Sequence, residues 1–337
     1  MLSWYDRHRR DLPWRAKPGN AANPYHVWLS EIMLQQTTVA AAGPYFHKFV
    51  GRWPHIDLLA AAPLDDVLAA WAGLGYYARA RNLHRAAREI ATDFGGAFPS
   101  DFDQLLALPG VGTYTAGAIA AIAFGAREVA VDGNAERVLA RYFGVETPLP
   151  TAKPRLRELA RSLLPRARTG DFAQALMDLG ATVCTPKSPG CGRCPWRANC
   201  RARQLAIAES LPRKAEKRPR PVRRGAAFVA QDVGGAILLE RRPENGLLGG
   251  MMQPPMTEWS GVFPRTEEAI RSAPVRGDWI KREGKVRHAF THFELELEVY
   301  AATVARRRND QRWVERSELP NVALPTVMRK ILDHALR

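Results

Sequence analysis

A short basic segment, residues 211–225, divides the chain into two halves with different hydrophobic patterns. The segment contains three prolines and no apolar periodicity, which is typical of an extended linker. Before it, apolar residues recur at helical spacing, and after it they alternate as in strands. A chain of 337 residues is long enough for about two domains. We therefore predict a multidomain protein with an all-α region over residues 1–208, a basic linker over 209–225 and an α+β domain over 226–337.

Periodicity and flanking residues also place individual elements. The helices expected in the first half are residues 24–39, 63–72, 78–94, 101–107, 114–124, 134–143 and 169–180. Ser100 or Asp101 is expected to cap the fourth of these, and Gly125 and Gly144 to end the fifth and sixth. In the second half we expect a hairpin within 226–240 that turns at 233–235, a strand over 292–300, and helices over 266–272 and 325–336.

The charge of the chain gives the first functional indication. There are 49 Lys and Arg against 34 Asp and Glu, a net charge of +15. A field of this sign attracts polyanions such as nucleic acid, although a solvated basic surface produces the same excess. Apolar runs fall short of the roughly 20 residues of a transmembrane helix, and the first residues show no apolar signal core. We therefore expect a cytoplasmic protein that does not bind membranes.

The chain has four cysteines, and all of them lie within seventeen residues, at positions 184, 191, 194 and 200. In a cytoplasmic chain such a cluster indicates a metal site rather than disulfides. Soft thiolates suit zinc or an iron–sulfur cluster, and the spacing does not decide between the two. The ligands expected from this pattern are Cys184, Cys191, Cys194 and Cys200.

The segment Leu108–Ala116 lies between two expected helices and has the pattern of a helix–hairpin–helix. Gly110 and Gly112 allow a tight turn and a close approach of the backbone to another molecule. The helix that follows presents free N–H groups where a phosphate can bind. The segment therefore predicts sequence-independent contact with the DNA backbone, against the alternative of an ordinary interhelical turn.

Two carboxylates stand in environments suited to acid–base chemistry. Glu31 lies in a strongly apolar helix, where burial would raise its pKa and make it a proton donor near neutral pH. Asp132 precedes a helix, whose positive end favours the charged form. This division of roles suits cleavage of a glycosidic bond through a cation-like sugar. The alternative is that Glu31 lies exposed on a helix face and that Asp132 only caps a helix.

The chain resembles the adenine DNA glycosylases of the MutY type, within the endonuclease III superfamily. The resemblance covers nearly the whole chain and rests on several long motifs. They are Leu12–Arg15, Trp28–Thr37, Gly73–Leu83, the segment Leu108–Ala116, Val131–Asn134 and the four cysteines in order.

This resemblance implies a role for each residue of the expected catalytic site. Glu31 would protonate adenine at N7, and Asp132 would stabilise the sugar cation while water completes hydrolysis. Asn134 would orient Asp132, and Tyr114 would line the pocket near the reacting sugar. The bifunctional relatives carry a lysine where Tyr114 stands, so the resemblance implies base release without an efficient strand-cutting step. The cysteines would hold a 4Fe-4S cluster with a structural, DNA-contacting task.

The resemblance also implies contacts to duplex DNA that contains adenine opposite 8-oxoguanine or guanine. Gln35, Gln36 and Tyr76 would enter the duplex and replace the stacking lost when adenine is flipped out. The second half resembles a MutT-like domain that recognises 8-oxoguanine, with Phe290, Thr291 and His292 near the lesion. The R-E-x-x-E-E signature of MutT-type pyrophosphatases is absent from it. A monomer is expected.

The pattern leaves two other functions open. The first is a glycosylase for another base, such as thymine or uracil mispaired with guanine, because relatives share the hairpin and the cysteines. The second is a DNA-binding protein that holds a metal and has no enzymatic activity. In the second half, Met251–Pro254 differ from the usual family residues, so the contacts of this segment are not predicted.

Overall fold

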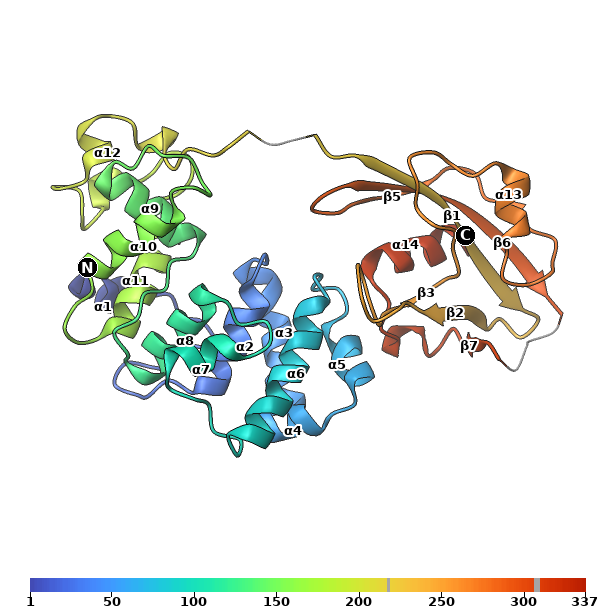
Figure 1. Ribbon diagram of the computed structural model, residues 1–337, viewed down its shortest axis with the longest axis horizontal. Helices are drawn as coiled ribbons and strands as arrows, with labels where there is room; N and C mark the ends of the chain where they lie inside the picture. Colours follow the sequence, from blue (N-terminus) through green and yellow to red (C-terminus); the bar gives the residue numbers. More distant parts are fainter. Residues whose placement is uncertain (217–218, 306–309) are drawn as a thin grey trace. The chain divides into compact units, whose positions relative to one another are not determined.

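The structure is a computed structural model that describes residues 1–216, 219–305 and 310–337 (Figure 1). The chain forms two compact units, of which residues 1–61 and 82–217 make the first and residues 62–81 and 218–337 the second. The first unit is helical, and the second is built around a β-sheet. The chain is therefore multidomain, with a helical region followed by an α+β domain, as the sequence predicts. In the described ranges no helix is long and apolar enough to cross a membrane.

Several helices of the first unit begin or end at the residues expected from the sequence. Asp101 caps α7 (Phe102–Ala107) by accepting two backbone hydrogen bonds. Gly125 and Gly144 take left-handed φ angles of 70° and 68° at the ends of α8 (Thr113–Phe124) and α9 (Gly133–Phe143). The other helices of this unit are α1 (Leu2–His8), α2 (Pro24–Leu34), α3 (Val39–Arg52), α4 (Ile56–Ala61), most of α6 (Ala78–Asp93), α10 (Lys153–Ser162), α11 (Thr169–Thr182) and α12 (Arg201–Gln204).

The helix expected over residues 24–39 is five residues shorter in the structure. It ends at Leu34, and Gln36 adopts a left-handed φ of 59° that a helix cannot contain. Thr38 then accepts a hydrogen bond from Ala41 N–H and caps α3, a helix that the periodicity did not predict. The break matters for the site because the chain turns at Gln35 and Gln36, about one helical turn after Glu31.

The helix α8 forms the centre of the first unit. Its residues are apolar on all sides and largely buried, as expected for a helix surrounded by others. It packs against α2, α7 and α11, and α11 also packs against α9. A Cβ at Gly170 would lie 2.6 Å from Ala121 O, so this glycine allows α11 to approach α8 closely. This arrangement brings the ends of α2, α8 and α9 to one cavity.

In the described part of the second unit, strands follow the order β3-β2-β1-β6-β4, with β5 paired to β6 and β7 to β2. The strands β1 (Val222–Asp232) and β6 (Glu294–Val304) run parallel along their whole length, and the other pairs are antiparallel. The remaining strands are β2 (Ile237–Arg241), β3 (Met252–Gln253), β4 (Ile280–Lys281), β5 (Val286–Ala289) and β7 (Arg312–Val314). The unit also contains α5 (Leu64–Trp71), α13 (Thr266–Arg271) and α14 (Thr326–Ala335).

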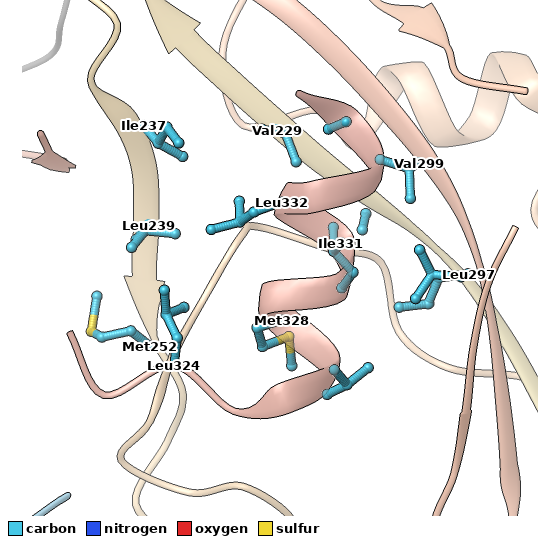
Figure 2. Packing of buried hydrophobic residues seen from close by; sticks show 14 of the residues in the cluster. Val229, Ile237, Leu239, Met252, Leu297, Val299, Leu324, Met328, Ile331 and Leu332 are labelled. Carbon is cyan, nitrogen blue, oxygen red and sulfur yellow. The ribbon is translucent and has the colours of Figure 1, made fainter. Parts of the chain in front are cut away.

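One face of this sheet is covered by α14, and the two form a hydrophobic core. Figure 2 shows Met328, Ile331 and Leu332 of this helix among side chains of the strands, including Val229 and Leu297. A strand within residues 292–300 and the hairpin at 233–235 are confirmed, but the expected alternation stops after Leu297, because Glu298 and Tyr300 are also buried, beside Lys281 and Phe228. The strand β1 begins at residue 222, within the segment expected to be linker, because residues 222–225 pair with β6.

Candidate active site

The first unit contains a cavity of about 730 Å³ that collects the catalytic residues expected from the sequence. Glu31 comes from α2, Tyr114 from the first turn of α8, and Asp132 and Asn134 from the start of α9. These residues are up to 103 positions apart in the chain, and the packing around α8 brings them together. Gln35 and Gln36 line the same cavity.

Glu31 is 6% exposed, and burial raises the pKa of its carboxyl to about 7. The charge of Asp132 contributes to this rise of the pKa. A hydrogen bond of 2.7 Å from Tyr114 Oη to Glu31 Oε2, and the positive charge of Arg15, act in the opposite direction. A pKa near 7 means that Glu31 holds its proton in a substantial part of the molecules at neutral pH, so it can serve as an acid.

Asp132 caps α9 through its side chain. Its Oδ1 accepts a hydrogen bond of 2.7 Å from Ala135 N–H, and its Oδ2 accepts one of 3.0 Å from Asn134 Nδ2. These bonds and the charge of Arg137 favour the carboxylate form, but burial outweighs them and raises the pKa of Asp132 above its usual range. The sequence anticipated the favourable helix end and missed the larger effect of burial.

A second hydrogen-bond path leads from Asp132 toward the cysteine segment. Arg137 Nη2 donates to Asn134 Oδ1 at 2.9 Å and to Gly180 O at 2.7 Å, and its Nε donates to Cys184 O at 2.7 Å. Asn134 therefore connects Asp132 with an arginine that is fixed to the first cysteine. Motif reasoning did not single out Arg137, although its position one turn after Asn134 on α9 is a usable signal.

Buried ion pairs support the wall of the cavity. Asp178 on α11 is fully buried and accepts hydrogen bonds from both Arg10 and Arg15, at 2.6 Å to Arg10 Nε and at 2.6 and 2.8 Å to the two Nη atoms of Arg15. These bonds fix the guanidinium of Arg15, whose charge acts on Glu31. Such a pair joins residues more than 160 positions apart, so no local pattern could reveal it.

Lys153 and Glu136 form another ion pair at this cavity. Lys153 Nζ lies 2.9 Å from Glu136 Oε1, and both residues line the cavity. The side chain of Glu136 is 10% exposed, whereas that of Lys153 is 45% exposed. The cavity thus has a third carboxylate in its wall and a lysine at its rim.

Of the two hairpin glycines, the fold requires Gly110 but not Gly112. Gly110 has a φ of 77°, and a Cβ there would lie 2.8 Å from Asn82 Cβ, so the turn itself requires glycine. Gly112 has a φ of −100°, and a Cβ would meet nothing within 4 Å. Gln35 Nε2 lies 3.4 Å from Gly110 O and 3.3 Å from Thr115 Oγ1, and Gln36 is exposed. The fold therefore leaves Gly112, at the start of α8, open to close approach.

The four cysteines line a second, small cavity of about 20 Å³. Arg141, which is 2% exposed, lines the same cavity. Its Nη1 donates a hydrogen bond of 2.7 Å to Thr185 O and lies 3.3 Å from Cys184 Sγ. In the described residues, no group of three or more His, Cys, Asp or Glu side chains is arranged to hold a single metal ion. Four thiols around one cavity, beside a buried cation, are a donor set that fits a cluster with several metal atoms.

The remaining expected site residues lie in the second unit. Tyr76 is 47% exposed with a left-handed φ of 48°, and its Oη is 3.0 Å from Thr291 Oγ1. Phe290 stacks on Phe293 at 4.8 Å and packs against the edge of the core, while His292 is exposed. The segment over residues 251–254, whose contacts the sequence left open, is buried.

Comparison with known proteins places both units in described families. Residues 29–166 match the family described as "HhH-GPD superfamily base excision DNA repair protein", and residues 226–334 match "NUDIX domain". The chain is 35% identical to adenine DNA glycosylase of Homo sapiens, over 98% of this chain and 72% of that one. It is 31% identical to adenine DNA glycosylase of Buchnera aphidicola subsp. Baizongia pistaciae, over 98% and 94%.

Among solved structures, a thermostable thymine-DNA glycosylase matches with a TM-score of 0.54 and 31% identity, over 60% of this chain and 93% of that one. A complex of endonuclease III with DNA matches with a TM-score of 0.52, over 61% and 93%. The identity there is 22%, so this second likeness concerns the fold of the helical region.

Proposed function

Because this chain belongs to the adenine DNA glycosylase family, we propose that it hydrolyses the N-glycosidic bond of adenine in duplex DNA, and that its substrate is adenine opposite 8-oxoguanine or guanine. The observation that carries this proposal is the pair of carboxyls in one cavity. Glu31 has a pKa near 7, and Asp132 is held by Ala135 N–H and Asn134. A cavity of about 730 Å³ has room for an extruded nucleoside.

In the proposed reaction, adenine leaves the base stack and enters this cavity. Protonated Glu31 donates its proton to adenine N7, the C1′–N9 bond breaks, and its electron pair leaves with the base. The carboxylate of Asp132 stabilises the cation that forms on the sugar. A water molecule then adds to C1′ and passes its proton to the Glu31 carboxylate, which restores the acid. Asn134 keeps Asp132 in place throughout.

Tyr114 supports a reaction that ends at base release. A strand-cutting glycosylase needs an amine that forms a Schiff base with the sugar, and a phenol cannot do so. In this chain the phenol is used as a hydrogen-bond donor to Glu31. Borohydride trapping of the protein on DNA with an abasic site checks this point: a trapped complex that forms as fast as adenine is released would contradict it.

Contacts to the DNA backbone are proposed for the helix–hairpin–helix, α7 to α8. Gly112 needs no glycine for the protein's own packing, so the missing side chain leaves room for a phosphate at the start of α8. Gln35, Gln36 and Tyr76 are proposed to enter the duplex where adenine has left. Tyr76 is suited to this because it is an aromatic residue that is 47% exposed.

The four cysteines are proposed to hold a 4Fe-4S cluster. When bound, the cluster would tie together the segment from Cys184 to Cys200. Two arginines of the protein already hold the start of this segment, because Arg141 contacts Cys184 Sγ and Arg137 donates a hydrogen bond to Cys184 O. Arg193 and Arg197 lie within this segment and Arg203 follows it, and all three are exposed and can contact phosphates.

Recognition of 8-oxoguanine is proposed for Phe290, Thr291 and His292. Thr291 and His292 are exposed at the turn between β5 and β6, where a base can reach their polar atoms. Phe290 stacks on Phe293 and so stabilises this turn. Its position at the edge of the core fits a supporting role better than direct insertion.

The decisive experiment measures adenine release from a duplex with adenine opposite 8-oxoguanine, for the wild type and for Glu31→Gln. We expect release by the wild type and none by the variant, with DNA binding retained. Full turnover by Glu31→Gln would remove Glu31 from the proposed role. The same assay with a panel of mispairs tests a second candidate, release of thymine opposite guanine, which the likeness to a thymine-DNA glycosylase favours.

A further inference from the structure

Glu136 is a third carboxylate in the candidate cavity, and neither step of the proposed reaction uses it. It lies one turn after Asp132 on α9, and its side chain is only 10% exposed. Its partner Lys153, the first residue of α10, has a side chain that is 45% exposed. The ion pair between them, 2.9 Å long, therefore joins a buried anion to a lysine that faces solvent.

Lys153 differs from the other basic side chains of the cavity wall. Arg10 and Arg15 are 26% and 6% exposed, and both are bound to the buried Asp178. A lysine ammonium has three protons, of which Glu136 Oε1 takes one. The protons of Lys153 that Glu136 does not use are available to another anion at the rim of the cavity.

The anion that must come to this rim is a DNA phosphate, because a nucleotide that enters the cavity brings its two flanking phosphates to the entrance. We propose that Lys153 binds one of these phosphates, and that Glu136 restrains Lys153 so that the contact forms only when a nucleotide is extruded. This inference rests on the proposed function and adds a specificity-determining pair to it.

The restraint follows from the burial of Glu136. On a duplex without an extruded nucleotide, Lys153 would have to leave Glu136 to reach a phosphate, and an unpaired buried carboxylate is costly. With a nucleotide in the cavity, the phosphate comes to Lys153 and the ion pair is kept. Glu136 therefore weakens binding to undamaged DNA more than binding to the substrate, which is a gain in discrimination.

The test uses the full chain with Lys153→Gln, Glu136→Gln and the double variant. One duplex is undamaged, and the other carries adenine opposite 8-oxoguanine with a 2′-fluoro sugar, which slows cleavage because fluorine disfavours the sugar cation. Dissociation constants come from fluorescence anisotropy at several salt concentrations. Arg155→Gln is the matched control, since Arg155 lies on the same helix and its side chain is 58% exposed.

We expect Lys153→Gln to weaken binding of the fluorinated duplex by about tenfold and to lower its salt slope by about 1, with little change for undamaged DNA. Glu136→Gln should strengthen binding of undamaged DNA by a fewfold and reduce discrimination. This gain should vanish in the Lys153→Gln background. Arg155→Gln should affect both duplexes slightly and equally.

Three results would overturn the inference. They are an equal loss on both duplexes in Lys153→Gln, no loss on either, and weaker binding of both duplexes by Glu136→Gln, which would indicate a purely structural pair. All of these are binding measurements. Failure of the proposed function would show instead as absence of base release by the wild type, so the two failures are separable.

Discussion

Tyr114 Oη donates a hydrogen bond of 2.7 Å to Glu31 Oε2, between residues 83 positions apart in the chain. The bond couples the helix–hairpin–helix to the proposed acid, because Tyr114 lies in the first turn of α8. It favours the charged form of Glu31 and so opposes the effect of burial, which nevertheless raises the pKa of Glu31 to about 7. A shift of the hairpin would therefore change the acidity of Glu31 as well as the shape of the cavity.

Replacement of Tyr114 by Phe should raise the pKa of Glu31, because it removes a hydrogen bond to the carboxylate. Base release needs protonated Glu31, so the rate falls as pH rises through this pKa. In Tyr114→Phe the falling limb should move to higher pH, by about one unit for a bond of ordinary strength. Single-turnover rates from about pH 5 to about pH 9 measure it. An unmoved limb would mean that another group titrates.

Replacement of Glu31 by Gln should stabilise the protein at alkaline pH. The folded-state pKa of about 7 exceeds the ordinary 4.5, so the folded state keeps a proton that the unfolded state loses. The free energy of unfolding therefore begins to fall as pH rises above the ordinary pKa. The loss is complete above the folded-state pKa, at about 3 kcal/mol. Gln has no such cost.

Urea unfolding of the wild type and Glu31→Gln at about pH 8 and about pH 4 checks this expectation. The difference in the free energy of unfolding should be large at the higher pH and small at the lower. Glu158→Gln is a suitable control, since its side chain is 70% exposed and its replacement should change stability little at either pH. A variant that is less stable than the wild type at both pH values would contradict the argument.

The sequence predicted the features that depend on neighbouring residues. Asp101 as a cap and Gly125 and Gly144 as helix ends follow from local backbone chemistry, and the structure contains all three. The strand within residues 292–300 likewise follows from the period of a strand, although its burial alternates only as far as Leu297. The break after Leu34 was missed because Val39 continues the helical spacing of the apolar residues across the polar residues 35–38, and only the left-handed Gln36 ends the helix.

The environment of the site could be predicted only in part. Burial of Glu31 follows from its apolar helix, but Tyr114 and Arg15 act on it from other parts of the chain, and Arg15 is fixed in turn by Asp178. For Asp132, the helix end was visible in the sequence, whereas the burial that raises its pKa depends on how α2, α8 and α11 surround it. Tertiary packing therefore sets the pKa values of Glu31 and Asp132, which the local motifs indicate only in part.

Replacement of Asp132 by Asn should separate its role as the cap of α9 from its proposed role in stabilising the sugar cation. Asn is as good a helix cap as Asp, so α9 should keep its start and thermal stability should change little. The charge that would stabilise the sugar cation is lost, and we expect the rate of base release to fall by about 10²–10³. Single-turnover rates and melting temperatures measured together test this. A large fall in melting temperature would show that the charge serves the fold.

Replacement of Arg141 by Met should destabilise the cysteine segment. Arg141 is 2% exposed and donates to Thr185 O, Pro186 O and Leu211 O at 2.7–3.0 Å. Met fills a similar volume but leaves these three carbonyls without a donor, and we expect a loss of about 3 kcal/mol in the free energy of unfolding. Arg155→Met, on the exposed surface of α10, is the control and should change it by less than about 0.5 kcal/mol.

The same variant tests whether Arg141 prepares the cysteines for their proposed cluster. Its Nη1 lies 3.3 Å from Cys184 Sγ, and a buried cation there favours thiolates over thiols. The protein purified with Arg141→Met should therefore show less visible absorption per chain than the wild type, while Arg155→Met should match it. Urea titration and the absorption spectrum give independent readings. A variant with normal colour and normal stability would show that the segment is held by its own loops, without Arg141.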